Sequence, residues 1–119
     1  MSGAQLLESA IFAWITNVVS FSLLYWWLDR GGPERRILEM GIRPDWRFPQ
    51  QDAPPEDVPE RWGPTYIDYL FLSFSTCTAF STTETSPMTR RAKMLMMLEA
   101  AISLVTITAV AARAINLLG

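Results

Sequence analysis

The stretch "FLSFSTCTAFSTTETSP", from Phe71 to Pro87, decides the fold because an apolar run in it gives way to a polar one. Six serine and threonine residues fall between Thr78 and Ser86, and one acid, Glu84, lies among them. Long apolar runs of the kind that suits a lipid bilayer precede and follow this stretch. The sequence therefore raises the question of why a hydroxyl-rich segment should lie between them.

The first apolar run extends from Ser9 to Leu28 without a charge, and Glu8 and Asp29 close it. Its twenty residues would form a helix about 30 Å long, which matches the hydrocarbon core of a bilayer. Aromatic residues cluster at its end, as they do at membrane interfaces. A signal peptide would need a positive start and small residues before a cleavage site, and the sequence has neither. We therefore predict an outer membrane-spanning helix at about residues 5–29.

The second apolar run begins at Met94 and is interrupted only by Glu99, Arg113 and Asn116. It contains no proline, and its only glycine is the last residue, so a helix is predicted at about residues 88–118. An acid at membrane depth normally faces protein or a water-filled cavity. The alternative for this acid is a position at the membrane interface, because three basic residues lie just upstream.

The connection between these runs, residues 30–63, is predicted to be an extramembrane loop. It holds six prolines, six arginines and seven acids, which makes it too polar for lipid and too rich in proline for a long helix. Residues 50–60, "QQDAPPEDVPE", are typical of an exposed irregular segment. The single cysteine, Cys77, permits no disulfide within the chain.

Several function classes are disfavoured by composition. The chain has no histidine, and it contains no phosphate-binding loop, nucleophile elbow or zinc-ligand spacing. Its net charge is -2 and its arginines are mixed with acids, which is unlike a nucleic-acid-binding surface. We therefore predict neither an enzyme nor a nucleic-acid-binding protein, with no cofactor and no resident metal.

Residues 64–78 are predicted to form a short helix that enters the membrane without crossing it. Pro64 and Thr65 suit a helix start, and Asp68 in the first turn complements the helix dipole. A helix of this length measures about 21 Å, which is too short for a span. The polar segment after it, residues 79–86, is tolerated at membrane depth only if protein or water surrounds it. The predicted fold is an all-α membrane protein with two spans and a re-entrant helix and loop.

This order of elements resembles the two-transmembrane pore domain of the tetrameric potassium-channel family. The segment "TCTAFSTTETSP" aligns without a gap with the family's filter pattern T-x-T-T-V-G-Y-G-D-x-x-P. Thr76 and Thr78 match its threonines, Glu84 its acid and Pro87 its proline. The resemblance covers residues 64–119, and the first helix only by position and hydropathy. The chain also resembles uncharacterised bacterial membrane proteins.

The resemblance implies a homotetramer in a lipid bilayer, in the bacterial plasma membrane, with both termini in the cytoplasm. The positive-inside rule indicates the reverse orientation, because nine of the ten basic residues lie in the loop and just before the second run. The implied selectivity filter consists of Thr78, Ala79, Phe80, Ser81, Thr82, Thr83 and Glu84. The implied pore-lining residues of the inner helix are Glu99, Ser103, Leu104, Ile107, Ala111 and Ile115. The alternative for the last four of these residues is contact with lipid or with other helices.

Two departures from the family pattern bear on the ion. Ser81 and Thr83 stand where the family has its two filter glycines, and Ala79 replaces a threonine. The glycines adopt backbone conformations that cost other residues free energy, so potassium selectivity of the usual kind is not expected. We expect instead a cation channel for Na⁺, Ca²⁺ or a mixture, with hydroxyl groups and a ring of Glu84 in its filter.

The main alternative is a non-conducting membrane protein that retains the pore-domain fold, or an accessory subunit of another transporter. In that case the hydroxyl groups join helices by hydrogen bonds. Glu84 is then a solvated loop acid that caps the second span, where Thr85 and Ser86 before Pro87 also offer a capping box. A tetramer would place four aromatic residues of the short helix between subunits, whereas in a monomer or dimer they would pack on their own chain. These residues are Tyr66, Tyr69, Phe71 and Phe74.

Overall fold

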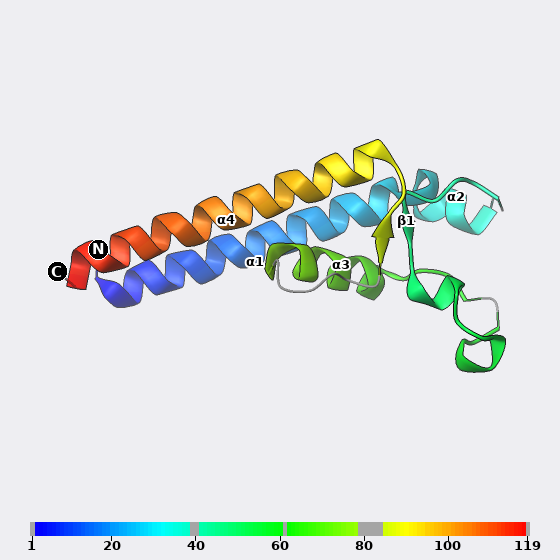
Figure 1. Cartoon of the computed structure of the whole chain (residues 1–119), viewed down its shortest axis with the longest axis horizontal. Helices are drawn as coiled ribbons and strands as arrows, with labels where there is room; N and C mark the ends of the chain where they lie inside the picture. The colour runs from blue at the N-terminus through cyan, green and yellow to red at the C-terminus, as the bar shows by residue number, and fades with distance from the viewer. Residues whose placement is uncertain (1, 39–40, 61, 79–84, 119) are drawn as a thin grey trace.

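The computed structural model describes residues 2–38, 41–60, 62–78 and 85–118 of the chain. It is mostly helical. Two long helices, α1 (Gly3–Leu28) and α4 (Arg90–Leu118), lie side by side in opposite directions, with the two ends of the chain close together (Figure 1). Both helices are long and apolar enough to cross a membrane, which confirms the prediction of two such segments.

Helix α1 begins and ends at sequence features that suit these positions. Ser2 and Gln5 form a capping box, in which the hydroxyl oxygen of Ser2 accepts from the Gln5 N–H at 3.1 Å and the Gln5 side chain accepts from the Ser2 N–H at 3.0 Å. After the helix, Arg30, Gly31 and Gly32 have φ angles of 56°, 81° and 106°. This left-handed conformation favours glycine and turns the chain sharply away from the helix axis.

The loop after α1 contains only short elements. Its expected lack of a long helix follows from its prolines, three of which begin short helical turns. Strand β1 (Trp46–Arg47) of this loop pairs antiparallel with β2 (Ser86–Pro87), which joins the loop to the segment just before α4. The loop elements are η1 (Asp29–Gly31), α2 (Pro33–Leu38), β1 (Trp46–Arg47), η2 (Pro49–Gln51) and η3 (Pro55–Asp57).

A third helix, α3 (Tyr66–Thr78), contacts both long helices and lies beside only part of their length (Figure 1). It occupies nearly the range 64–78 expected for the short helix. At its start, a carboxylate oxygen of Asp68 accepts hydrogen bonds from the Thr65 N–H at 2.7 Å and from the Thr65 hydroxyl at 3.2 Å. The acid in the first turn therefore holds the residue before the helix in place.

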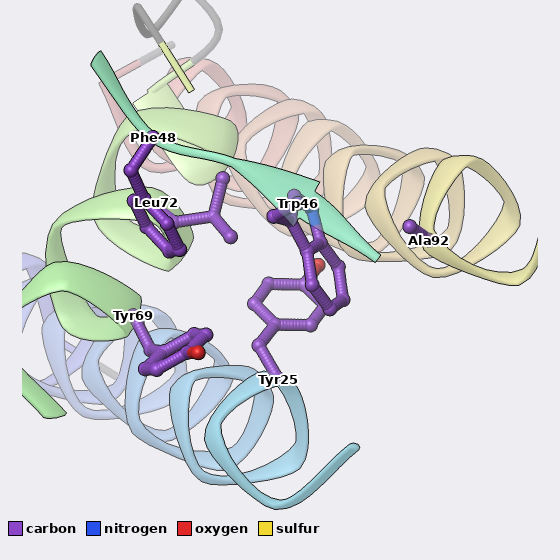
Figure 2. Packing of buried hydrophobic residues seen from close by; sticks show 6 residues of the cluster. All are labelled: Tyr25, Trp46, Phe48, Tyr69, Leu72 and Ala92. Atoms are coloured by element: carbon purple, nitrogen blue, oxygen red, sulfur yellow. The ribbon is translucent and has the colours of Figure 1, made fainter. Parts of the chain in front are cut away.

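A buried hydrophobic cluster lies at the loop end of the molecule, where α1, α3 and α4 meet the loop (Figure 2). The ring of Trp46 lies 4.8 Å from that of Tyr25 in a tilted arrangement, and Phe48 packs edge-on at 5.4 Å from the ring of Tyr69. Leu72 completes the contact on α3 and is fully buried. Burial of such side chains favours folding by about 1.5–3 kcal/mol each, so the loop is part of the core.

The aromatic residues of α3 divide into two groups. Tyr69 is fully buried and Tyr66 packs edge-on against Trp26, so these two pack on their own chain and the expectation that they lie between subunits is wrong for Tyr69. Phe71 and Phe74 remain 60% and 46% exposed, although Phe74 also contacts a tryptophan of α1. These two rings are therefore the more exposed pair, while Tyr66 is half-buried.

The residue that caps the start of α4 is not one of those that the sequence suggested. The hydroxyl oxygen of Thr89 accepts from the N–H of Ala92 at 3.2 Å, so Thr89 caps the helix. The alternative in which Thr85 and Ser86 cap it is wrong, because Ser86 lies in β2 and the helix starts only at Arg90.

Candidate functional site

The described residues on either side of the polar segment, Thr78 and Thr85, lie near opposite ends of α3. Thr78 is the last residue of α3. Thr85 is buried and lines a pocket together with Ile67, Asp68 and Phe71 of the first half of α3. The chain therefore leaves α3 at one end and is found beside the other end only seven residues later. The predicted filter residues Ala79, Phe80, Ser81, Thr82, Thr83 and Glu84 lie outside the described residues.

The last turns of α3 use most of their hydroxyl groups within the molecule. The hydroxyl of Thr76 donates to the carbonyl of Leu72 at 2.8 Å, and that of Thr78 donates to the carbonyl of Ser75 at 3.0 Å. Both bonds lie within the helix, where such side chains commonly return to the preceding turn. Thr78 therefore keeps only the lone pairs of its hydroxyl oxygen for any group beyond the end of α3.

A buried carboxyl group lies where α1, α3 and α4 meet. Glu99 of α4 is fully buried. Its Oε1 accepts from the Tyr25 hydroxyl of α1 at 2.7 Å. Its Oε2 lies 2.5 Å from the Ser73 hydroxyl oxygen and 2.9 Å from the Cys77 sulfur, both on α3. The Ser73 hydroxyl oxygen also lies 2.6 Å from the carbonyl oxygen of Val18 in α1. One carboxyl group thus connects three helices.

Two further polar side chains join the same region. Asn17 of α1 donates through its amide to the Cys77 sulfur at 3.3 Å and to the backbone carbonyl of Glu99 at 3.4 Å. The hydroxyl of Ser103 donates to the carbonyl of Cys77 at 2.7 Å. Because the last carbonyls of a helix lack partners within it, this bond satisfies one of them. We call Asn17, Tyr25, Ser73, Cys77, Glu99 and Ser103 the Glu99 network.

The Glu99 network corrects part of the predicted pore lining. Glu99 and Ser103 are covered by α1 and α3 of their own chain, so they do not line a pore. The face of α4 that carries them is the face that packs on α3. The other four predicted residues, Leu104, Ile107, Ala111 and Ile115, are exposed. Two of them, Ile107 and Ala111, help to form an apolar groove of about 340 Å³ between α1 and α4.

A second polar group, which the sequence did not indicate, lies at the loop end. Asp29 is fully buried at the end of α1. Its Oδ1 accepts from the backbone N–H groups of Asp45 and Trp46 at 2.8 and 3.3 Å, and its Oδ2 accepts from the Tyr69 hydroxyl at 2.6 Å. Arg36 donates to the carbonyl of Asp29 at 2.7 Å and lies over the Tyr69 ring. The acid therefore fixes the loop against α1 and α3.

Asp45 forms the corresponding connection to α4. Arg91 donates to both of its carboxylate oxygens at 2.7 Å, and the Thr89 hydroxyl donates to Oδ1 at 2.6 Å. Burial alone would raise the pKa of Asp45, but the hydrogen bonds from Arg91 and Thr89 outweigh it and hold the pKa below its ordinary value. The carboxylate is therefore ionised at neutral pH, and Arg91 binds it through a bidentate, charge-assisted contact.

No local signal in the sequence marks these two acids, because their partners are distant in the chain. Tyr69 is 40 residues from Asp29, and Arg91 is 46 residues from Asp45. The sequence did hold a signal for the strand next to Asp45. Trp46 and Phe48 alternate with a charged residue, which is typical of a strand with one buried face.

Neither the protein-family models nor the curated proteins nor the solved structures give a match to the chain. Within the described ranges, histidine, cysteine and acidic residues form no group of three or more that could hold a metal ion. The candidate site is therefore defined by the contacts of α3 and by the polar segment that follows it.

Proposed function

We propose that the chain is the pore-forming subunit of a tetrameric cation channel, in which α3 and residues 79–86 form the re-entrant segment. The observation that carries this proposal is the depth at which α3 ends. Its last turn bonds to Asn17, the 15th of the 26 residues of α1, and to Ser103, the 14th of the 29 residues of α4. At about 1.5 Å per residue, both positions lie about 20 Å from the helix starts, near the middle of a span.

The polar residues after α3 begin at this depth and need polar surroundings. Backbone groups cannot face lipid at mid-membrane without partners, so water or protein must supply them. One protomer offers two spans and a short helix, which do not enclose a passage. Copies arranged around an axis would do so, and closed cyclic symmetry is the usual form of such assemblies. The resemblance to the potassium-channel family favours four copies.

The chemistry of the proposed filter favours hydrated or partly hydrated cations. Ser81, Thr82 and Thr83 supply hydroxyl oxygens, which are hard donors suited to Na⁺ and Ca²⁺. Four copies of Glu84 would form an acidic ring that concentrates cations and excludes anions. With serine and threonine at the positions of the family's glycines, four backbones do not readily form a potassium filter. The permeant ions would therefore be Na⁺, Ca²⁺ or a weakly selected mixture.

The exposed apolar stripe of α4 would then face the passage below the filter. Leu104, Ile107, Ala111 and Ile115 follow one another at helical spacing and are exposed beyond the end of α3. A narrow cavity with such a lining can close by losing its water. This part of the proposal gives the channel a gate that needs no separate domain.

Reconstitution into planar bilayers tests the proposal through reversal potentials for K⁺, Na⁺, Ca²⁺ and Cl⁻ under bi-ionic conditions. We expect cation currents without strong preference for K⁺, and we expect Glu84→Gln to reduce both conductance and cation preference. Glu56→Gln is the matched control, because Glu56 is an exposed acid of the loop. Tetramers that fold and remain silent in every ion would overturn the proposal. A strongly potassium-selective current would overturn the assignment of the filter chemistry.

One observation favours a second candidate, a non-conducting membrane protein with the same fold. Ser73 and Ser103 already use their hydroxyl groups between helices, as expected where hydroxyl groups serve to join helices. If residues 81–83 do the same, each substitution of these residues by alanine should destabilise the protein. A filter would instead respond in conductance while stability stays the same, so denaturation and current measurements on one set of variants separate the two candidates.

A further inference from the structure

The Ser73 hydroxyl holds too few protons for the contacts that it makes. Its oxygen lies 2.6 Å from the Val18 carbonyl oxygen and 2.5 Å from Glu99 Oε2. Two oxygens at such distances need a proton between them, because their lone pairs otherwise repel. A serine hydroxyl has one proton, and a carbonyl oxygen has none. If Ser73 donates to Val18, the second proton must come from the Glu99 carboxyl group.

The surroundings of Glu99 favour the same conclusion. The titratable groups that face it are the Tyr25 phenol from α1 and the Cys77 thiol from α3, and both are neutral in their ordinary state. Among the described residues, no lysine or arginine forms a salt bridge with it. A buried carboxylate without a cation carries a large desolvation cost, which a proton removes.

We propose that Glu99 is a proton-binding site, occupied at neutral pH, whose proton lies between Oε2 and the Ser73 hydroxyl oxygen. The inference concerns the inside of one protomer and does not depend on ion conduction. With the proton present, Ser73 accepts from Glu99 of α4 and donates to Val18 of α1, so α3 is bonded to both long helices at once. Without it, Ser73 has one proton for two acceptors and must release one of them. Proton loss therefore weakens the attachment of α3.

Replacement of Glu99 by glutamine gives a sharp test, because the amide can donate to Ser73 and accept from Tyr25 as the protonated acid does. In the unfolded chain, glutamate ionises at about pH 4.3. The wild-type protein must then release a proton when it unfolds, whereas Glu99→Gln releases none. The unfolding equilibrium constant of the wild type should rise relative to the variant by up to about tenfold per pH unit between pH 5.5 and 8.5.

The measurement is unfolding by sodium dodecyl sulfate in mild detergent micelles, followed by tryptophan fluorescence at several pH values. Glu8→Gln is the matched control, because it makes the same chemical change at an exposed residue of α1; it should show no such trend. An advantage of Glu99→Gln that increases with pH supports the proposal. A constant difference, or a wild type that gains stability over the variant as pH rises, would overturn it.

Infrared spectroscopy provides a second readout that does not require unfolding. The folded wild-type protein at pH 7 should show the C=O stretch of a protonated carboxylic acid, and Glu99→Gln should lack it. If the variant does not fold, the band can be assigned in the wild type by isotopic labelling of glutamate. No such band in the folded protein would show that Glu99 is ionised.

Discussion

Replacement of Arg91 by methionine should destabilise the protein more than its position near the surface implies. The side chain of Arg91 is 55% exposed, whereas that of Asp45 is only 1% exposed. Methionine removes both donors and leaves a buried carboxylate with the Thr89 hydroxyl as its remaining side-chain donor. Removal of one partner of a buried ion pair costs about 3–5 kcal/mol. We expect about 3 kcal/mol, because the exposed guanidinium contributes less than a fully buried one.

Removal of the acidic partner, Asp45, should lower the free energy of unfolding by less than removal of Arg91. Asp45→Ala leaves Arg91 free to turn toward water, so the expected loss is about 2 kcal/mol from the hydrogen bonds alone. Arg90→Met is the control, because Arg90 is the exposed neighbour at the start of α4, and it should leave the free energy of unfolding nearly unchanged. Equal losses for Arg91→Met and Arg90→Met would show that the contact with Asp45 contributes nothing.

The pH dependence of the difference in unfolding free energy between the wild type and Arg91→Met gives the decisive result. Because the pKa of Asp45 is lowered in the folded protein, its stabilising contribution is complete above the ordinary value of 3.8 and is lost as pH falls through the lowered value. In Arg91→Met the buried carboxyl has lost its cation, so burial favours its protonated form and the variant is relieved of its penalty as pH falls. The difference in unfolding free energy between the wild type and Arg91→Met should therefore be largest near pH 8 and shrink as pH falls to about pH 3. A difference that persists unchanged at pH 3 would refute the argument.

Three other substitutions should separate buried from exposed contacts in the same unfolding assay. Leu72→Ala removes a fully buried side chain and should cost about 2–5 kcal/mol. Ser103→Ala leaves the carbonyl of Cys77 without its 2.7 Å donor, and a loss of about 1–3 kcal/mol is expected. Asp52→Ala should cause no measurable change at physiological salt, because its ion pair with Arg47 is exposed and water and salt screen it.

The two long helices could be predicted because their signal is local. An uncharged run of twenty residues is sufficient to indicate a span, and α1 and α4 begin and end within a few residues of the predicted ranges. The short helix was also predictable from its length and from the acid in its first turn. These features depend on neighbours in the sequence and on the thickness of a bilayer, and no contact between distant residues is needed to infer them.

The role of Glu99 could not be predicted to the same degree. The sequence allowed a position for Glu99 either at membrane depth or at the interface. The direction of its side chain depends on which face of α4 meets α3. Tyr25 lies 74 residues from Glu99 in the chain, and Ser73 lies 26 residues away. The rotation of α4 about its axis is set by these distant contacts, so the sequence alone did not determine which face of the helix carries the acid. Leu104, one residue after buried Ser103, lies on the exposed side of α4, and whether it lines a pore stays a prediction.

The contacts of α3 also bear on the order of folding and assembly. At its start, Tyr69 is bonded to Asp29, and at its end, the carbonyl of Cys77 is bonded to Ser103. Both ends are therefore held by side chains of the same chain, before any neighbouring copy is needed. The point at which the chain enters residues 79–84 is thus determined within one protomer, and in the proposed channel the neighbouring copies would only supply surroundings for that segment. A variant that breaks contact at either end of α3 should lose stability as a monomer, whereas in the proposed tetramer a substitution of Phe71, which is 60% exposed, should act mainly on association.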